Sequence, residues 1–129
     1  MVKLLSNVAR IYSTPRIVLV QILEKFKMET IDKIKQQIAE NPILIYMKGS
    51  PKFPSCGFSA QTVEALMQCG ERFAYVDILQ NPDIRAELPN YADWPTFPQL
   101  WVEGELIGGC DIVMEMFRSG ELQPLIKET

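Results

Sequence analysis

The chain has 129 residues, of which 13 are lysine or arginine, 16 are aspartate or glutamate and none is histidine, so its formal net charge is −3. Hydrophobic residues make up 47% and charged residues 22%, which is typical of one globular domain and excludes a disordered chain. The lack of histidine excludes Ser-His and Cys-His catalytic pairs, 2-His-1-carboxylate iron sites and Rieske-type clusters.

Residues 1–27 differ in composition from residues 28–129. They hold five basic residues and one acidic residue, against eight basic and fifteen acidic residues in the remainder. A basic leader of this kind resembles an organellar transit peptide. The alternative, which we favour, is that translation begins at Met28 and that the leader is a misassigned upstream extension. We therefore predict an N-terminal extension (1–27), whether disordered, helical or artefactual, and one domain (28–129).

The leader does not predict a membrane partner. Its longest apolar run, Ile17 to Val20, is far shorter than the roughly 20 residues that a membrane span needs.

From Met28 onward, helical and strand patterns alternate. Thr30 is predicted to cap a first helix, which Asn41-Pro42 ends. The apolar face of this helix recurs at helical spacing and consists of Ile31, Ile34 and Ile38. An unbroken apolar run from Ile43 to Met47 predicts a strand that is covered on both faces.

After a loop that contains two prolines, a second helix is predicted from about Phe58 to Gln68, and Gly70 stops it. Its inward-facing residues are expected to be Ala60, Val63, Leu66 and Met67. Residues 73–78 predict another short strand, and Pro82 fits the first position of a third helix.

Two antiparallel strands are predicted around Glu103-Gly104-Glu105, which has the composition of a tight hairpin turn. A last helix follows Gly108-Gly109, and its apolar face is formed by Ile112, Val113, Met116 and Phe117. The order α-β-α-β-α-β-β-α predicts an α/β fold with a thioredoxin-like layout, in which a four-stranded mixed sheet has helices on both faces.

The three cysteines, Cys56, Cys69 and Cys110, contain no Cys-x-x-Cys pair. We therefore expect a reducing compartment and place the protein in the cytoplasm. Three scattered thiols without histidine also cannot supply four zinc ligands from one chain. Cys69 is expected to be buried as a small hydrophobic residue, and no redox role is assigned to the sulfur of Cys110.

The chemistry concentrates at Cys56, which is predicted where the loop after the first strand meets the second helix. Unpaired backbone N–H groups and the helix dipole favour a thiolate there, which suits a nucleophile or a metal ligand. Lys48, at the end of the preceding strand, adds a nearby cation, and Gly57 lets the backbone approach closely. Ser59 stands where a Cys-x-x-Cys protein has its second cysteine, so the motif has no resolving thiol.

Four short motifs occur in register, namely Lys48-Gly49-Ser50-Pro51, Cys56-Gly57-Phe58-Ser59, Trp94-Pro95-Thr96-Phe97-Pro98-Gln99-Leu100 and Gly108-Gly109-Cys110-Asp111. Together they resemble the monothiol glutaredoxins of the Cys-Gly-Phe-Ser type, especially the short single-domain bacterial members. The resemblance covers about residues 28–129. It implies that Lys48 and Arg85 bind the glycine carboxylate of glutathione, and that Cys110 and Asp111 hold its γ-glutamyl end.

The resemblance also implies roles for the segment that faces Cys56. The backbone of Phe97 is expected to hydrogen-bond the cysteinyl part of glutathione, and Pro98 is expected to follow a cis peptide bond. The implied function is to carry a labile 2Fe–2S cluster between two subunits and deliver it to apo-proteins. Such a cluster needs four thiolates, and Cys56 supplies one per chain as the metal ligand, so two glutathione thiols complete the set.

The implied partners are therefore glutathione, a second copy of the chain, apo iron–sulfur proteins and a BolA-type protein. Two other hypotheses remain open. The chain is either a glutathione-dependent thiol-disulfide oxidoreductase that removes glutathione from proteins, or an adaptor that keeps the fold without the chemistry. Nucleotide-binding motifs are absent, and the acidic composition of residues 28–129 argues against a nucleic-acid partner.

Overall fold

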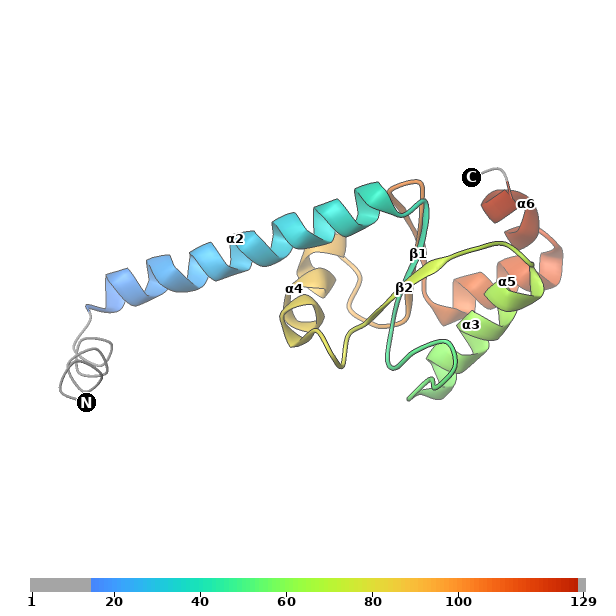
Figure 1. Cartoon of the computed structure of the whole chain (residues 1–129), viewed down its shortest axis with the longest axis horizontal. Coiled ribbons are helices and arrows are strands. Elements are labelled where there is room, and N and C mark those ends of the chain that lie inside the picture. Colours follow the sequence, from blue (N-terminus) through green and yellow to red (C-terminus); the bar gives the residue numbers. More distant parts are fainter. Residues whose placement is uncertain (1–14, 128–129) are drawn as a thin grey trace.

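The computed structural model describes residues 15–127 and has a thioredoxin-like α/β fold (Figure 1). Four strands form one mixed sheet in the order β2-β1-β3-β4. Strand β1 (Ile43–Met47) runs parallel to β2 (Ala74–Asp77) and antiparallel to β3 (Gln99–Val102), and β3 forms a hairpin with β4 (Glu105–Gly108). The predicted four-stranded mixed sheet is confirmed.

Helices cover both faces of this sheet. One face packs against α2 (Arg16–Glu40) and α4 (Pro82–Ala92), and the other packs against α3 (Gly57–Gln68), α5 (Cys110–Ser119) and α6 (Leu122–Lys127). The central strand β1 is therefore enclosed between two helical layers. It is the element from which the loop toward Cys56 departs.

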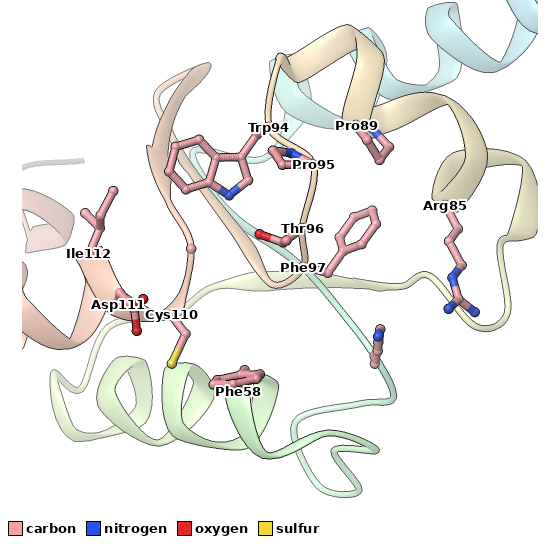
Figure 2. A pocket seen from close by; sticks show the side chains of 12 residues that line it. Phe58, Arg85, Pro89, Trp94, Pro95, Thr96, Phe97, Cys110, Asp111 and Ile112 are labelled. Carbon is pink, nitrogen blue, oxygen red and sulfur yellow. The ribbon is translucent and has the colours of Figure 1, made fainter.

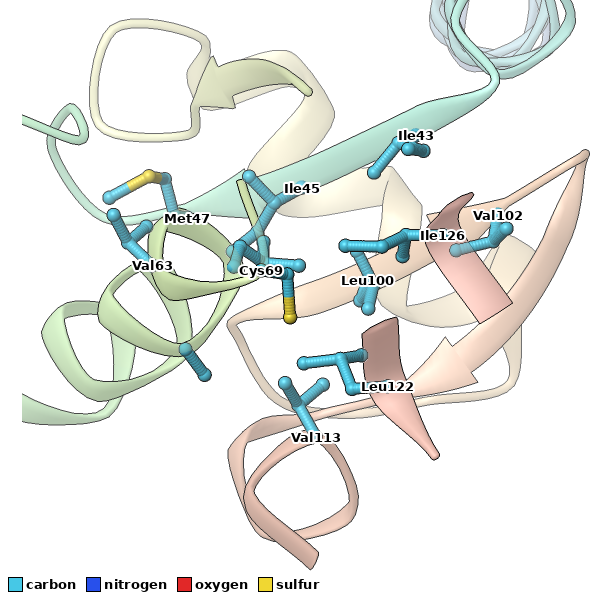
Figure 3. Packing of buried hydrophobic residues seen from close by; sticks show 12 residues of the cluster. Ile43, Ile45, Met47, Val63, Cys69, Leu100, Val102, Val113, Leu122 and Ile126 are labelled. Carbon is cyan, nitrogen blue, oxygen red and sulfur yellow. The ribbon is translucent and has the colours of Figure 1, made fainter. Parts of the chain in front are cut away.

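All five residues of β1 are buried, as its unbroken apolar run predicts. Leu44 and Tyr46 belong to the core under α2 and α4, whereas Ile45 and Met47 belong to the core under α3, α5 and α6 (Figure 3). Burial of each aliphatic side chain stabilises the fold by about 1.5–3 kcal/mol. The buried hydroxyl of Tyr46 donates a hydrogen bond to Oε1 of Gln37 at 2.9 Å, so its polar group has a partner.

Helix α2 begins earlier than predicted. It starts at Arg16, with Pro15 as the N-cap residue, and the predicted cap Thr30 lies buried in its interior. The prediction of a helix start at Thr30 was wrong because no glycine or proline follows Pro15 before Pro42, so the leader offers no stop signal. Residues 1–14 of the leader lie outside the described residues.

The N-terminal half of α2 projects beyond α4 (Figure 1). Its large apolar side chains are exposed, among them Ile17 (68%), Leu23 (67%) and Phe26 (63%). The helix packs on the domain from Thr30 onward, and Lys27 forms an ion pair with Glu87 of α4 at 3.8 Å. None of the helices between residues 15 and 127 is both long and apolar enough to cross a membrane.

Two predicted helix faces need correction in detail. Met67 of α3 is 48% exposed, and Ile112 of α5 is 38% exposed, whereas Val63, Leu66 and Val113 are buried as expected. Met67 follows the buried Leu66, and Ile112 precedes the buried Val113. The helical period therefore predicts the residues at the centre of a buried face better than those at its edge.

Candidate functional site

Cys56 lies at the tip of α3. It is the N-cap residue of this helix, with an extended backbone (φ −152°, ψ 142°), and its carbonyl accepts the backbone N–H of Ala60 at 2.9 Å. The thiol is partly exposed. The structure therefore places the sulfur at the positive end of a helix, in contact with solvent, where a thiolate is favoured.

The pKa of Cys56 is lowered. Partial burial, the largest single influence, would raise it. The backbone N–H and the hydroxyl of Ser59, the backbone N–H of Phe58 and the Lys48 cation together outweigh burial, because each stabilises the thiolate. Two contributions expected from the sequence, the helix tip and Lys48, are present here, and the Ser59 hydroxyl adds a third.

Sequence reasoning missed the role of Ser59. Its side chain is fully buried, and its Oγ accepts the backbone N–H of Lys48 at 3.2 Å. Because the same hydroxyl also favours the Cys56 thiolate, Ser59 links the end of β1 to the sulfur. A serine three residues after the N-cap of a helix is a recognisable signal, since this position faces back toward the cap.

The loop between β1 and α3 has a compact shape that depends on Gly49. Gly49 has φ +89°, and a Cβ atom there would collide with the carbonyl of Phe53 and lie 2.8 Å from the Ser55 nitrogen. The Ser55 N–H donates to the Lys48 carbonyl at 2.9 Å, which closes the loop just before Cys56. Only glycine fits this position without a shift of the backbone.

A cavity of about 730 Å³ lies beside this loop (Figure 2). Five of the six predicted site residues line it, and they are Lys48, Arg85, Phe97, Cys110 and Asp111. The sixth, Cys56, is not part of the lining, but its motif neighbour Phe58 is. Figure 2 shows Arg85 at one side of the cavity and Cys110 with Asp111 at the opposite side, so basic and acidic groups face each other across it.

The wall between these two ends is formed by residues 94–97. Phe97 precedes Pro98 through a cis peptide bond, as expected. Trp94, at the start of this segment, also lines the cavity. Its indole Nε1 is buried and has no hydrogen-bond partner among the described residues.

The other two cysteines are buried. Cys69 is 7% exposed and belongs to the core, as predicted, and burial together with the nearby Glu71 charge raises its pKa. Cys110 is 9% exposed, and its Sγ lies 3.6 Å from Oε1 of Gln61. Within residues 15–127, no group of three or more cysteine, aspartate, glutamate or histidine side chains is arranged to hold a metal ion.

Comparison with known proteins agrees with this geometry. A model of the glutaredoxin family matches residues 43–107. The chain is 82% identical over 100 residues to glutaredoxin 4 of Escherichia coli K12, an alignment that covers 78% of this chain and 87% of the relative. It is 78% identical over 102 residues to glutaredoxin 4 of Haemophilus ducreyi, covering 79% of this chain and 95% of the relative. The chain belongs to the glutaredoxin family.

Solved structures of other glutaredoxins have the same fold. The buckwheat glutaredoxin–glutathione complex superposes with a TM-score of 0.72 at 29% identity, covering 81% of this chain and 94% of the buckwheat chain. Reduced apo GrxS14 of poplar superposes with a TM-score of 0.64 at 42% identity, covering 78% of this chain and 90% of the poplar chain. In this chain, positions 56–59 have the sequence Cys-Gly-Phe-Ser, so the motif contains one cysteine.

Proposed function

We propose that the chain binds glutathione in the cavity beside Cys56 and that two such chains carry a 2Fe–2S cluster, which they deliver to apo-proteins. The observation that carries this proposal is the charge arrangement of the cavity. Lys48 and Arg85 line it together with the start of α5, where no side chain caps the first N–H groups. Glutathione has a carboxylate at each end and an ammonium group beside one of them, which matches this pattern.

Each end of the cavity suits one end of the tripeptide. The two cations favour the glycine carboxylate through charge-assisted hydrogen bonds. The uncapped N–H groups of α5 favour the γ-glutamyl carboxylate, and the Asp111 carboxylate favours the adjacent ammonium. The backbone of Phe97 then remains for the cysteinyl part between them. The buckwheat relative, which was solved as a glutathione complex, supports this choice of ligand.

The thiol inventory supports a shared cluster. A 2Fe–2S cluster needs four ligands, usually thiolates. Cys56 is the partly exposed cysteine of the chain, and Cys69 and Cys110 are buried. Two Cys56 thiolates and two glutathione thiols complete the set, so the cluster is cargo held between two chains. We assign this role to residues 28–129 and to the cytoplasm, with BolA-type proteins and apo iron–sulfur proteins as partners.

Anaerobic reconstitution of the full chain with iron, sulfide and glutathione tests the proposal. Visible absorbance and dimerisation are expected to appear together and to require both glutathione and Cys56. Cys69→Ser is the matched control, because it removes a buried thiol and should leave the cluster intact. A cluster that forms equally well in Cys56→Ser, or in wild type without glutathione, would contradict the proposal.

The lowered pKa of Cys56 also favours a second function, the removal of glutathione from proteins. The Cys56 thiolate attacks the glutathione sulfur of a protein–glutathione disulfide, the protein leaves as a thiolate, and a mixed disulfide with Cys56 forms. A second glutathione thiolate attacks this disulfide, releases oxidised glutathione and regenerates Cys56. Rapid glutathione-dependent turnover of such disulfides is the expected result for this function. Efficient cluster formation with negligible turnover would argue against it.

A further inference from the structure

Asp77, the last residue of β2, connects two segments that lead to the cavity. Its Oδ1 accepts the backbone N–H of Gly49 at 2.9 Å and the backbone N–H of Leu79 at 2.9 Å. Gly49 directly follows Lys48, and Leu79 belongs to the connection that leads to α4. One carboxylate oxygen therefore holds the loop after β1 against the loop after β2.

The connection continues from Asp77 to Arg85. The side-chain amide of Asn81 donates to the Asp77 carbonyl at 2.8 Å, and the backbone N–H of Arg85 donates to the Asn81 carbonyl at 3.0 Å. Asp77 thus bonds the residue that follows Lys48, and it is connected to Arg85 through two successive hydrogen bonds by way of Asn81. Both cations line the same cavity, whereas Asp77 does not.

The backbone pairing of the sheet ends where this connection begins. The register of β1 and β2 finishes at Met47 with Asp77, and the Ile78 N–H donates to the Met47 carbonyl at 2.9 Å. Beyond that point, the hydrogen bonds of the loop between Lys48 and Ser55 are internal, apart from those to Asp77 and to Ser59. The Asp77 carboxylate therefore ties the residue after Lys48 to the end of β2, and the Asp77 backbone carbonyl starts the link toward Arg85.

We propose that Asp77 is a positioning residue that fixes Lys48 and Arg85 at the separation needed to grip one carboxylate, and so makes the cavity selective for a peptide with a free C-terminus. The inference rests on the proposed binding of glutathione. Two long side chains reach the same carboxylate only when their backbones are held at a fixed distance, because each gains a charge-assisted hydrogen bond with strict geometry. Without this fixed distance, the cavity keeps its other contacts with the peptide and loses its preference for a free C-terminal carboxylate.

The test compares glutathione with its C-terminal glycinamide, which lacks the glycine carboxylate, by amide chemical-shift titration of the full chain. Wild type is expected to bind glutathione about tenfold more tightly than the amide, as charge-assisted hydrogen bonds predict. Asp77→Ala should reduce this preference to about twofold or less while the affinity for the amide stays unchanged. Asp77→Asn should retain most of the preference, because its amide oxygen can still accept both N–H groups.

Two further variants control for a general loss of structure. Asn41→Ala removes a comparable bond, from its side-chain amide to the Gln37 carbonyl at 2.8 Å, near the opposite end of β1, and should keep the full preference. Asn81→Ala removes only the link toward Arg85 and should give an intermediate preference for glutathione. This variant also tests the inference if Asp77→Ala does not fold. An equal loss of affinity for both ligands in Asp77→Ala or Asn81→Ala would overturn the inference, as would an Asp77→Asn variant that has lost the preference completely.

Failure of the proposed function has a different signature. If wild type binds neither glutathione nor the amide, the proposed function is wrong and this inference is wrong with it. If wild type binds both tightly and with equal affinity, glutathione binding stands, and the role assigned to Lys48, Arg85 and Asp77 is wrong.

Discussion

The two ends of α3 carry one cysteine each, and their environments are opposite. Cys56 is the N-cap residue and is partly exposed, whereas Cys69 is the C-cap residue and is buried. For Cys56 the donors of Ser59 and Phe58 and the Lys48 cation outweigh burial and lower the pKa. For Cys69 burial and the Glu71 carboxylate both raise the pKa. The same side chain on the same helix therefore has a lowered pKa at one end and a raised pKa at the other.

Cys110 shows that a helix N-terminus alone does not produce an exposed thiol. It is the first residue of α5, yet its side chain is buried and its sulfur faces Gln61. The difference from Cys56 lies in exposure, because the loop before Cys56 leaves the sulfur open to solvent. Reactivity therefore requires the helix end and solvent access together.

The largest expected difference is in alkylation. In the native chain at pH 7, Cys56 should react with iodoacetamide on the order of 100-fold faster than Cys69, because its pKa is lowered and its sulfur is accessible, whereas Cys69 has a raised pKa and is buried. Mass spectrometry of the labelled peptides over time measures both rates. Labelling of the unfolded chain provides the control, since the two rates should then converge. Faster labelling of Cys69 in the native chain would contradict the comparison.

Gly49, in the loop that leads to α3, and Gly70, just after α3, should differ in their tolerance of a side chain. Gly49→Ala is expected to cost about 3 kcal/mol or more of unfolding free energy, because φ is +89° and the new Cβ meets backbone atoms of Phe53 and Ser55. Gly70→Ala, with φ +79° but no heavy atom within 4 Å, should cost only about 1 kcal/mol.

Urea denaturation measures both costs, and alkylation of Cys56 shows where they act. Gly49→Ala should also change the alkylation rate, because its loop closes just before the sulfur, whereas Gly70→Ala should not. Equal costs for the two substitutions would mean that the loop relaxes around the new Cβ.

The contrast also shows what the sequence could predict. The strand, loop and helix pattern with Gly57 was sufficient to place Cys56 at a helix tip, because these signals are local. The cavity joins positions 48, 85, 97 and 110–111, which no periodicity connects, so their common site followed from the resemblance alone. Asp77 and Gly49 lie 28 residues apart in sequence, and their hydrogen bond exists only because β1 and β2 pair in parallel. Propensity rules do not encode such a contact.

Ser59→Ala should have a moderate effect on Cys56. Deleting the hydroxyl removes a donor to the thiolate, so the pKa of Cys56 rises and the thiolate fraction at pH 7 falls. The alkylation rate at pH 7 should drop about fivefold, whereas the rate well above the pKa should be nearly unchanged. The pH profile of alkylation separates these two regions.

Thr62→Val is the matched control for Ser59→Ala. The Thr62 side chain is also fully buried on α3, but its hydroxyl donates to the Phe58 carbonyl at 2.8 Å. Its loss should leave the pH profile of Cys56 in place. A profile that shifts equally in both variants would assign the effect to altered packing of α3.

The smallest expected effects on cysteine alkylation come from removing the charges of Lys48 and Glu71. Lys48→Gln should raise the pKa of Cys56 and slow its alkylation at pH 7 by about twofold, because Lys48 is the weakest of its resolved influences and salt screens it. Raising the ionic strength should reduce the difference between wild type and this variant. A difference that persists in high salt would point to a direct contact between Lys48 and the sulfur.

Glu71→Gln at the other end of α3 should lower the pKa of Cys69 and still leave its alkylation within about twofold of wild type. Burial is the larger cause of the raised pKa, and the substitution does not expose the sulfur. The two charge variants therefore separate ionisation from access. If Glu71→Gln alone made Cys69 as reactive as Cys56, charge would control both ends of the helix, and the buried position of Cys69 in the core could not be what keeps it inert.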